Sequence, residues 1–543
     1  MDLINLLRCG YFPKELPPPF STEFFATNFF QIESQWPNEN DRTGFPKIPE
    51  SIPVEFSIPK KDYIRRKLSI PNPVNQSYLS KIVCENWDKI ETHCNESRFS
   101  LSIPVENIPN DKNNRAIKPV KSFIDFRKNC IIDSFDKIFE LKVDISWFYP
   151  SIYTHSIPWA LHTKEISKQR QSDMSLEGNV LDKYIRKCQS NQTNGIPIGP
   201  DTSLVLAEIV ACSVDKELGE VFSALKGYRY YDDYYFYFSK REEAEEVLKH
   251  LQYLLNEFQL SLNEKKTIII QYPYPYDTEW ALPLRKFQFR MDERGQERDI
   301  WKYFNLAFDL YQKNIDEPVL KYTIRRIEKY KIYDSNWELF QSLILKCTIL
   351  DPKTIKNVIK ILLAYPTLVD VQKVTKVVYE LLNYHCNKNH SYEVAWALWL
   401  AKTFNVNIIN EFANYIFSSN DIIPIVIALD LKKAGLINSD VNTSCLVSGL
   451  TKDSLHGEKW LLTYESVMND WLQSVDHNIL DDDPYFKVMK DNEVNFYDQS
   501  KQITPVDIED EVEEYTDGNY TDDTDSPRFP DISGMFFGFD DYD

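Results

Sequence analysis

Two adjacent carboxylates, Asp232 and Asp233, are the residues whose type and setting most clearly indicate chemistry. Eight of the nine other residues from 228 to 238 are aromatic, which predicts that the pair lies in an apolar hairpin. Neighbouring carboxylates in such surroundings repel each other and lose hydration, which is costly unless cations compensate. Because Mg²⁺ prefers carboxylate oxygens, the pair favours a site for two such ions, with Mn²⁺ as an alternative metal. The other interpretation is a surface turn between edge strands, and the pair alone does not decide between them.

The spacing of apolar residues predicts the elements that must position these carboxylates. A third carboxylate, Asp144, stands in an aromatic run that is predicted to form a strand over residues 141–149. Further along, the pattern predicts a Gly/Pro loop over 195–203, a helix over 203–218, strands over 228–238, a helix over 242–258 and a strand over 267–271. These elements would bring the three carboxylates together.

Composition and charge set the class of the protein. The chain has 543 residues, of which 43% are hydrophobic and 14% aromatic, so several domains with sizeable cores are expected. Of the net charge of −20, residues 501–543 supply −12, because they include 14 acidic residues and only two basic ones, Lys501 and Arg528. The other 500 residues carry the remaining −8 and include basic clusters such as Arg65-Arg66-Lys67, which leaves room for a nucleic-acid channel. Glycine-rich nucleotide-binding motifs of the Rossmann and Walker types are absent from the sequence.

The cysteine pattern and hydropathy indicate the compartment. Nine cysteines occur without any C-x-x-C pair, so neither a disulfide framework nor a structural zinc site is expected. The sequence has no run of about 18 apolar residues and no signal-peptide pattern at its beginning. We therefore expect a cytoplasmic protein with no membrane partner.

Four regions follow one another along the chain. Residues 1–75 are rich in proline and aromatic residues, which predicts a segment that wraps a surface. Residues 76–298 mix strand and helix patterns, whereas residues 299–500 show successive helical patterns whose spacing fits HEAT-like pairs. The clearest of these helices are predicted over 319–330, 336–350, 355–364, 371–384 and 391–404. The acidic residues 501–543 are predicted to be disordered.

The order of the motifs resembles the palm of reverse transcriptases. Asp144, the loop Gly195-Ile196-Pro197-Ile198-Gly199, the run Tyr230-Tyr231-Asp232-Asp233 and the run Leu262-Asn263-Glu264-Lys265-Lys266-Thr267 occur in the order of motifs A, B, C and D. Around motif A, the run from Asp144 to Trp159, with Tyr153-Thr154-His155-Ser156-Ile157-Pro158-Trp159 as its most distinctive part, is similar to the abortive-infection and related defence-associated reverse transcriptases of bacteria.

This resemblance implies a fold and an activity. The fold would be an α+β fingers and palm over 76–298, wrapped by residues 1–75 and followed by an all-α HEAT-like domain. The protein would be a nucleotidyltransferase that adds dNTPs, using two metal ions held by three acidic residues. It would act in anti-phage defence. The group also implies protein-primed synthesis that is untemplated or loosely templated, a single-stranded DNA product and homo-oligomers. A noncoding RNA or a second defence protein would be a further partner.

The resemblance assigns catalytic roles to five residues. Asp144, Asp232 and Asp233 would ligate the metal ions, and the carbonyl of Ile145 would contribute a further ligand. Lys266 would protonate or neutralise the leaving pyrophosphate, although a solvated lysine is an equally simple interpretation.

Five further residues are candidates for substrate binding. Tyr149 would be the steric gate that excludes the 2′-hydroxyl of ribonucleotides, and ordinary core packing is the alternative. Gly199 and Ser203 would let a template or primer strand approach the backbone closely. Arg66 and Arg115 would bind the triphosphate, whereas a solvated face is the usual interpretation of a charge run.

Two rival functions remain open, and so does the primer. Most reverse transcriptases have glutamine at the position of Ile198. The isoleucine removes a polar contact near the templating base, and this departure fits the abortive-infection group. The rivals are a conventional RNA-templated enzyme of intron or retron type and a non-catalytic helical scaffold. The primer tyrosine is unknown; Tyr515, Tyr520 and Tyr542 are candidates, and the alternative is that the tail mimics nucleic acid and blocks a basic channel.

Overall fold

The structure is a computed structural model that describes residues 1–61, 64–107, 115–275, 280–290, 292–315, 317–472 and 474–508. In these ranges the strands are β1 (Val54–Lys61), β2 (Ile64–Ile70), β3 (Pro104–Glu106), β4 (Ile117–Pro119), β5 (Phe139–Asp144), β6 (Lys226–Tyr230), β7 (Asp233–Phe238) and β8 (Ile268–Gln271). The helices among them are α1 (Leu3–Cys9), α2 (Glu23–Thr27), α3 (Phe29–Gln35), α4 (Pro73–Glu85), α5 (Trp87–Cys94), α6 (Phe123–Asp133), α7 (Phe148–Ser151), α8 (Ser156–His162), α9 (Lys164–Gln169), α10 (Glu177–Lys187), α11 (Asp201–Val221) and α12 (Arg241–Glu257).

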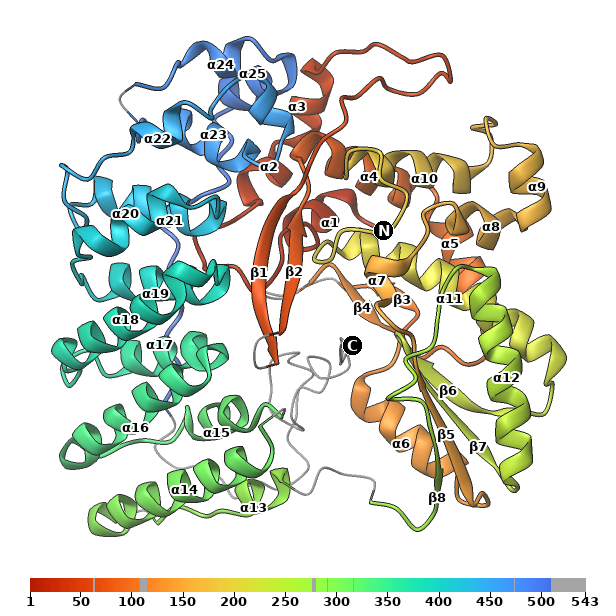
Figure 1. Ribbon diagram of the computed structural model, residues 1–543, viewed down its shortest axis with the longest axis horizontal. Coiled ribbons are helices and arrows are strands. Elements are labelled where there is room, and N and C mark those ends of the chain that lie inside the picture. Colours follow the sequence, from red (N-terminus) through yellow and green to blue (C-terminus); the bar gives the residue numbers. More distant parts are fainter. Residues whose placement is uncertain are drawn as a thin grey trace.

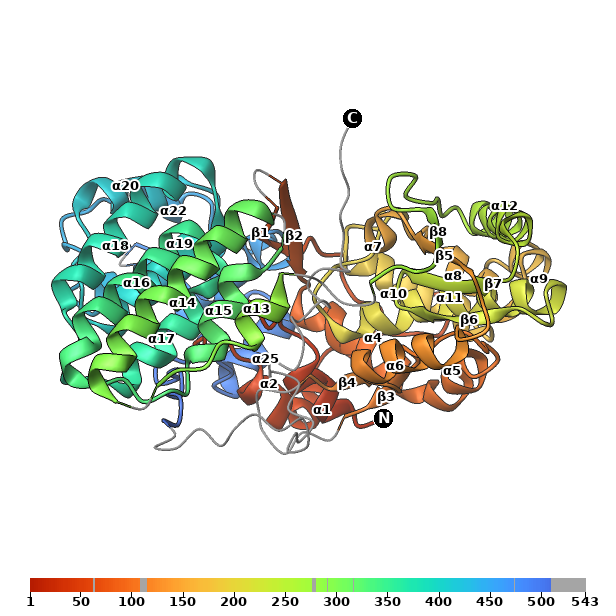
Figure 2. The ribbon, with the colours of Figure 1, turned by 90° about the horizontal axis from the view of Figure 1, so that it is seen from below.

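The remaining helices form the second half of the molecule. They are α13 (Ala281–Arg285), α14 (Glu293–Lys313), α15 (Val319–Ile327), α16 (Trp337–Leu350), α17 (Ile355–Ala364), α18 (Val371–His385), α19 (Ser391–Thr403), α20 (Asn410–Ser418), α21 (Ile422–Lys433), α22 (Ser444–Val447), α23 (Trp460–Met468), α24 (Asn478–Asp481) and α25 (Pro484–Asp491). Short 3₁₀ turns lie at 334–336, 352–354, 386–388 and 453–456. Figures 1 and 2 show the two halves side by side, with the long hairpin of β1 and β2 between them.

An antiparallel four-stranded sheet, in the order β6-β7-β5-β8, forms the centre of the first half. Alternate residues of β7 point to opposite faces of the sheet. Tyr234 and Phe236 join the main core, whereas Tyr235 and Tyr237 pack with Phe126 of α6 in a second cluster. Because both faces are covered, the strand can be aromatic throughout, which explains the run that the sequence displays.

The predicted elements of this half are confirmed except at one strand end. The strand predicted over 141–149 ends at Asp144, and residues 148–151 are helical. Between them Trp147 has a left-handed backbone with φ +48°, which turns the chain away from the sheet. Pro150 lacks the N–H that a ladder needs, which bars a paired strand beyond Tyr149, whereas the turn at Trp147 ends the strand earlier. The end of the strand places Asp144 at the edge where the other carboxylates lie.

The second half is a layered stack of helices, as Figure 1 shows. The helices predicted over 319–330, 336–350, 355–364, 371–384 and 391–404 are confirmed to within about three residues at each end. Local signals fix several starts: the Asp370 carboxylate accepts hydrogen bonds from the first N–H groups of α18, and Asp483 does the same for α25, which begins with Pro484. Helices pack in pairs, α14 with α15, α16 with α17, α18 with α19 and α20 with α21, and α16 also packs on α18 and α19 on α21, which is consistent with HEAT-like pairs.

The boundaries of this half differ from the predicted ones. The predicted boundary at 298/299 falls inside α14, which spans Glu293–Lys313. At the other end, residues 501–508 are ordered against the helices: the Lys501 ammonium donates to Ser21 Oγ, and Ile503 is buried. The remainder of the predicted disordered tail, residues 509–543 with Tyr515, Tyr520 and Tyr542, lies outside the described residues.

The proline-rich segment, predicted to wrap the fingers, contacts both halves of the molecule. Phe20 forms an antiparallel bridge with Tyr497, and the Ser21 N–H donates to the Phe496 carbonyl over 3.0 Å. The indole N–H of Trp396, in α19, donates to the Glu15 carbonyl over 2.9 Å. Figure 2 shows α1 and α2 between the two halves. The segment therefore fixes the sheet-containing half against the helical half.

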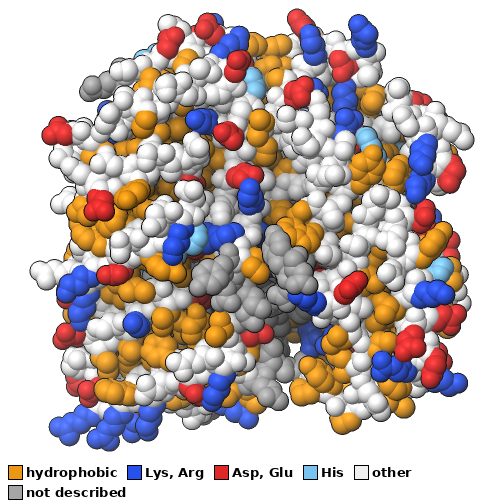
Figure 3. Space-filling view, viewed as in Figure 1, with side chains coloured by type: hydrophobic (Ala, Val, Ile, Leu, Met, Phe, Trp, Pro, Cys, Tyr) orange, Lys and Arg blue, Asp and Glu red, His pale blue; other side chains and the backbone are white. Residues whose placement is uncertain are grey.

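Charge, cysteines and hydropathy complete the description. On the face in Figure 3, acidic and basic side chains are interspersed over both halves. All nine cysteines fall within the described residues and are free thiols, as expected. Among the described helices, none combines the length and apolar character that crossing a membrane requires.

Candidate active site

The three predicted metal-binding carboxylates lie together at one edge of the sheet. Asp144 ends β5 and pairs in register with Asp233, which begins β7, and Asp232 immediately precedes it in the turn. All three are buried, with exposed fractions of 4%, 5% and 8% for Asp144, Asp232 and Asp233. The Ile145 N–H donates to the Asp232 carbonyl over 3.1 Å, so the turn is tied to the end of β5. The surface-turn interpretation of the acidic pair is therefore wrong.

The electrostatics of this cluster favour a bound cation. Burial, together with the Asp144 carboxylate, raises the pKa of Asp232 to about 8. Burial and the carboxylates of Asp232 and Asp144 raise the pKa of Asp233 well above its usual range. Oδ1 of Asp232 and Oδ2 of Asp233 are buried without a hydrogen-bond partner among the described residues. Orphaned carboxylate oxygens beside a third carboxylate are a donor set that hard divalent cations take, so these residues fit metal binding.

Motif D supplies the positive charge at this cluster. The Lys266 Nζ lies 3.0 Å from Oδ2 of Asp144, and the Asn263 N–H donates to the Asp144 carbonyl over 2.9 Å. An antiparallel bridge between Ile145 and Leu262 holds the two segments together. Lys266 thus neutralises a carboxylate of the cluster, whereas its action on pyrophosphate stays a prediction. The metal contact of the Ile145 carbonyl also stays a prediction.

A cavity of about 1240 Å³ opens in front of the carboxylates, between the two halves. Its walls come from the hairpin of β1 and β2, from motifs A and B, and from the helical half, and Asp232 is the member of the acidic cluster that lines it. Small-molecule sites usually measure about 300–1,000 Å³. The cavity is therefore large enough for more than one nucleotide.

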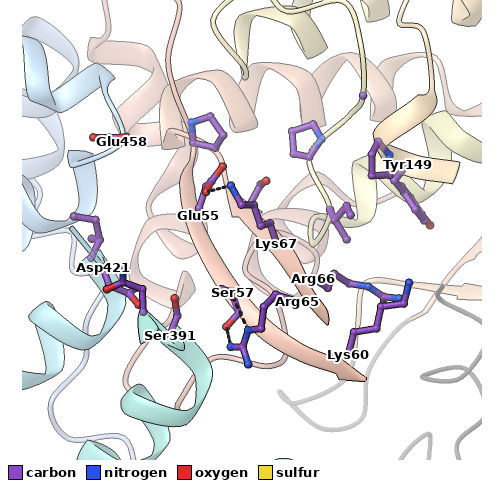
Figure 4. A pocket seen from close by; sticks show the side chains of 18 of the residues that line it. Glu55, Ser57, Lys60, Arg65, Arg66, Lys67, Tyr149, Ser391, Asp421 and Glu458 are labelled. Atoms are coloured by element: carbon purple, nitrogen blue, oxygen red, sulfur yellow. Dashed lines mark hydrogen bonds and ion pairs between the residues drawn. The ribbon is translucent and has the colours of Figure 1, made fainter. Parts of the chain in front are cut away.

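Tyr149 and Arg66 both line this cavity, and the Arg66 side chain lies below Tyr149 in Figure 4; their roles in substrate binding stay predictions. Arg66 extends from β2 toward Tyr149, with Lys60 of β1 beside it (Figure 4). The preceding residue, Arg65, points the other way, because neighbouring residues of a strand alternate between faces. Its guanidinium pairs with the buried Glu393 carboxylate of α19. Arg66 therefore faces the palm, whereas Arg65 anchors the hairpin to the helical half.

The structure corrects the prediction that Arg115 binds triphosphate. Its guanidinium donates to the Asp201 carboxylate over 2.8 Å and to the carbonyls of Phe12 and Gly199 over 2.6 and 2.7 Å. With these partners it lies away from the residues that line the cavity. Arg115 instead anchors the N-terminal segment to the start of α11.

Gly199 and Ser203 also have structural surroundings. A Cβ at Gly199, where φ is +133°, would lie 2.8 Å from the Pro13 side chain and 3.2 Å from the Ser69 carbonyl. The glycine is therefore required by the approach of this chain's own segments, and not by a nucleic-acid strand. Ser203 is 1% exposed in the first turn of α11, so its hydroxyl does not reach the cavity. Contact of Gly199 and Ser203 with a template or primer strand stays a prediction.

The helical half contributes a wall of the cavity that the sequence did not reveal. Its residues there are mostly polar and uncharged, and Tyr415 is 51% exposed among them. They are Cys386, Asn387, Asn389, Ser391, Tyr415, Ser418, Ser419, Asn420, Asp421, Ile422 and Glu458. These residues come from separate helices and the turns between them and follow no motif, so spacing along the chain carries no signal for them.

A second group of metal-ligand types lies near this wall. His385, His390 and Glu393 bring one ligand atom each to within 4.8 Å of one another. The Nδ1 atoms of the two imidazoles are 2.8 Å apart, and both oxygens of Glu393 are bound by the Arg65 guanidinium. A cation would compete with that guanidinium for the same carboxylate, so the group is an ionic contact between hairpin and helix.

Comparison with known proteins gives one clear match. Residues 109–289 match the family model described as reverse transcriptase (RNA-dependent DNA polymerase), a range that contains all four motifs. No curated protein matches the chain. Among solved structures, telomerase from Candida tropicalis, in complex with a fragment of telomeric RNA, is 12% identical and covers 70% of this chain and 68% of its own, with a TM-score of 0.28. A TM-score this low supports no conclusion about function.

Proposed function

We propose that this chain, whose residues 109–289 form a reverse-transcriptase domain and make it a nucleotidyltransferase, is a DNA polymerase that adds dNTPs at the cluster of Asp144, Asp232 and Asp233. The observation that carries the proposal is the pair of orphaned carboxylate oxygens in this buried cluster, beside a cavity of nucleotide size. A structural role would leave them paired, because an unpaired buried carboxylate is costly. A non-catalytic scaffold would not retain such a cluster.

Two Mg²⁺ ions held by these carboxylates would lower the pKa of an attacking 3′-hydroxyl and neutralise the leaving pyrophosphate. The residues around the cluster would orient the reactants. The Tyr149 ring stands at the cavity wall with Asp232, where it would collide with a 2′-hydroxyl and so favour dNTPs. The Arg66 guanidinium, which extends toward Tyr149, would bind the triphosphate (Figure 4).

The proposal extends to untemplated or loosely templated synthesis. Ile198 lines the cavity in the motif B loop, and its carbonyl accepts a hydrogen bond from the Ser69 N–H over 2.7 Å. An apolar side chain there offers no amide to hold a templating base. The resemblance of the run from Asp144 to Trp159 to abortive-infection enzymes supports the remaining features: a protein primer, homo-oligomers and a role in anti-phage defence.

The test separates the templated from the untemplated function. Purified protein is incubated with each α-labelled dNTP and Mg²⁺, first without nucleic acid and then with an RNA template and a DNA primer, and is run on a denaturing protein gel. We expect label on the polypeptide without nucleic acid, and no label in the double variant Asp232→Asn/Asp233→Asn. If incorporation of label requires the template and primer, the protein is a conventional reverse transcriptase and the untemplated function is wrong. No incorporation under either condition would contradict the polymerase proposal.

A further inference from the structure

The guanidinium of Arg229 is fully buried directly behind the catalytic turn, and nothing in the proposed chemistry uses it. Its exposed fraction is 0%. Two carboxylates of α11 bind it: Glu208 Oε1 lies 2.7 Å from Nη2, and Asp215 Oδ2 lies 2.9 Å from Nε. The third group that it binds is the Tyr231 carbonyl, 2.8 Å from Nη1. One side chain thus links α11 to the residue that precedes Asp232.

Tyr231 has a backbone conformation that needs such support. Its φ is +56°, a left-handed value that costs a bulky residue roughly 1–2 kcal/mol. Its N–H donates to Ser102 Oγ over 2.8 Å, and its carbonyl accepts from Arg229. Both peptide groups that flank Tyr231 are therefore held, which fixes the direction in which the chain delivers Asp232.

The two supports belong to one buried group of side chains. Ser102 Oγ also lies 3.4 Å from Glu208 Oε2, and Ser100 Oγ donates to Oε1 of the same carboxylate. The segment that carries these serines lies along β6, since the Arg229 N–H donates to the Phe99 carbonyl over 2.7 Å. Buried ion pairs of this kind add little net stability, because desolvation offsets their attraction. Their placement behind the turn indicates another role.

We propose that Arg229, Glu208, Asp215 and Ser102 form a positioning network that holds the Tyr231–Asp232 turn in the geometry required for metal binding by Asp232. The network touches neither substrate nor metal and acts through the Tyr231 peptide groups. This inference rests on the proposed function, in which Asp232 is a metal ligand. It predicts that the loss of one hydrogen bond to the turn weakens metal binding without unfolding the protein.

Ser102→Ala tests this, because it removes the acceptor of the Tyr231 N–H without leaving a buried charge unpaired. Ser77→Ala is the matched control: Ser77 is also buried, and its hydroxyl donates to the Val74 carbonyl over 2.9 Å within α4, a helix that carries no member of the network. Binding of Mn²⁺ is measured by electron paramagnetic resonance of the free ion, and thermal denaturation reports folding. The Mg²⁺ dependence of dNTP incorporation provides a second measurement.

We expect Ser102→Ala to raise the Mn²⁺ dissociation constant about tenfold, the loss typical when an outer support of a metal ligand is removed. Ser77→Ala should bind Mn²⁺ as wild type does and melt within a few degrees of Ser102→Ala. High Mg²⁺ should restore incorporation by Ser102→Ala. Equal Mn²⁺ affinities in the two variants would overturn the positioning network, whereas wild-type protein that binds no Mn²⁺ would overturn the proposed metal site itself.

Discussion

The buried acidic cluster predicts that neutralising Asp232 destroys activity and yet stabilises the metal-free protein. Burial and the neighbouring Asp144 raise the pKa of Asp232 to about 8, whereas the same group titrates near 3.9 in an unfolded chain. Between about pH 4 and pH 8 the folded state therefore holds a proton that the unfolded state has lost. The stability contributed by this group is complete below about pH 4 and is lost as pH rises through 8.

The size of the effect follows from the same shift. Each pH unit in this interval lowers the free energy of unfolding of wild type by about 1.4 kcal/mol. Over the whole interval the loss is on the order of 5 kcal/mol. Asp232→Asn replaces the carboxyl group by a neutral group of the same shape and removes this dependence. In EDTA at pH 8 we expect the Tm of Asp232→Asn to exceed that of wild type by about 3 °C or more. At pH 5 the stability difference should shrink to about 1.5 kcal/mol, because that pH lies only about one unit above the pKa of the unfolded group.

Thermal denaturation in EDTA and in Mg²⁺, at both pH values, measures these differences. Mg²⁺ should raise the Tm of wild type at pH 8, because it binds only the folded cluster, and should leave Asp232→Asn unchanged. Asp482→Asn, which removes an exposed carboxylate far from β5 and β7 in the sequence, is the control for net charge and should behave as wild type. A lower Tm for Asp232→Asn than for wild type in EDTA at pH 8 would refute the reasoning.

Four further substitutions test single contacts. Tyr149→Val should lower the preference for dNTPs over rNTPs at least about tenfold in competition assays, and unchanged preference would remove the gate role. Arg66→Ala should raise the KM for dNTPs about tenfold with little change in Tm. Arg65→Ala, its neighbour, should instead destabilise the protein by about 3 kcal/mol in denaturant titration, because Glu393 is left buried and unpaired; the opposite pattern would contradict the assignment of the two faces. Arg115→Ala should likewise lower stability, by about 3 kcal/mol, and leave the KM for dNTPs unchanged, whereas a raised KM would restore its role at the triphosphate.

Much of the sheet and the acidic cluster was predictable because their signals are local. The aromatic run around Asp232 predicted an apolar hairpin, and the aromatic run around Asp144 predicted a strand. The end of β5 at Asp144 was missed, because aromatic composition favours a strand whether or not a ladder partner exists. The left-handed turn at Trp147 depends on the fold around it, and residue type did not indicate it.

Contacts between distant segments set the limit of prediction at the site. Arg115 looked available in the sequence, but its partner Asp201 and the Phe12 carbonyl reach it only through the fold. Gly199 was predicted to allow a close approach to the backbone. In the structure the segments that approach it are those of Pro13 and Ser69 of the same chain. The wall that includes Tyr415 comes from helices that share no motif with the palm, so only the packing of the two halves reveals it.

The most direct test of the central claim is the incorporation of α-labelled dNTPs by single-carboxylate variants in Mg²⁺. Wild type and the exposed-site control Asp482→Asn should incorporate label at the same rate, and EDTA should abolish incorporation by both. Asp144→Asn and Asp233→Asn should fall to background while retaining the folded state. Incorporation by either variant at the wild-type rate would contradict the assignment of the acidic cluster as the site of nucleotidyl transfer.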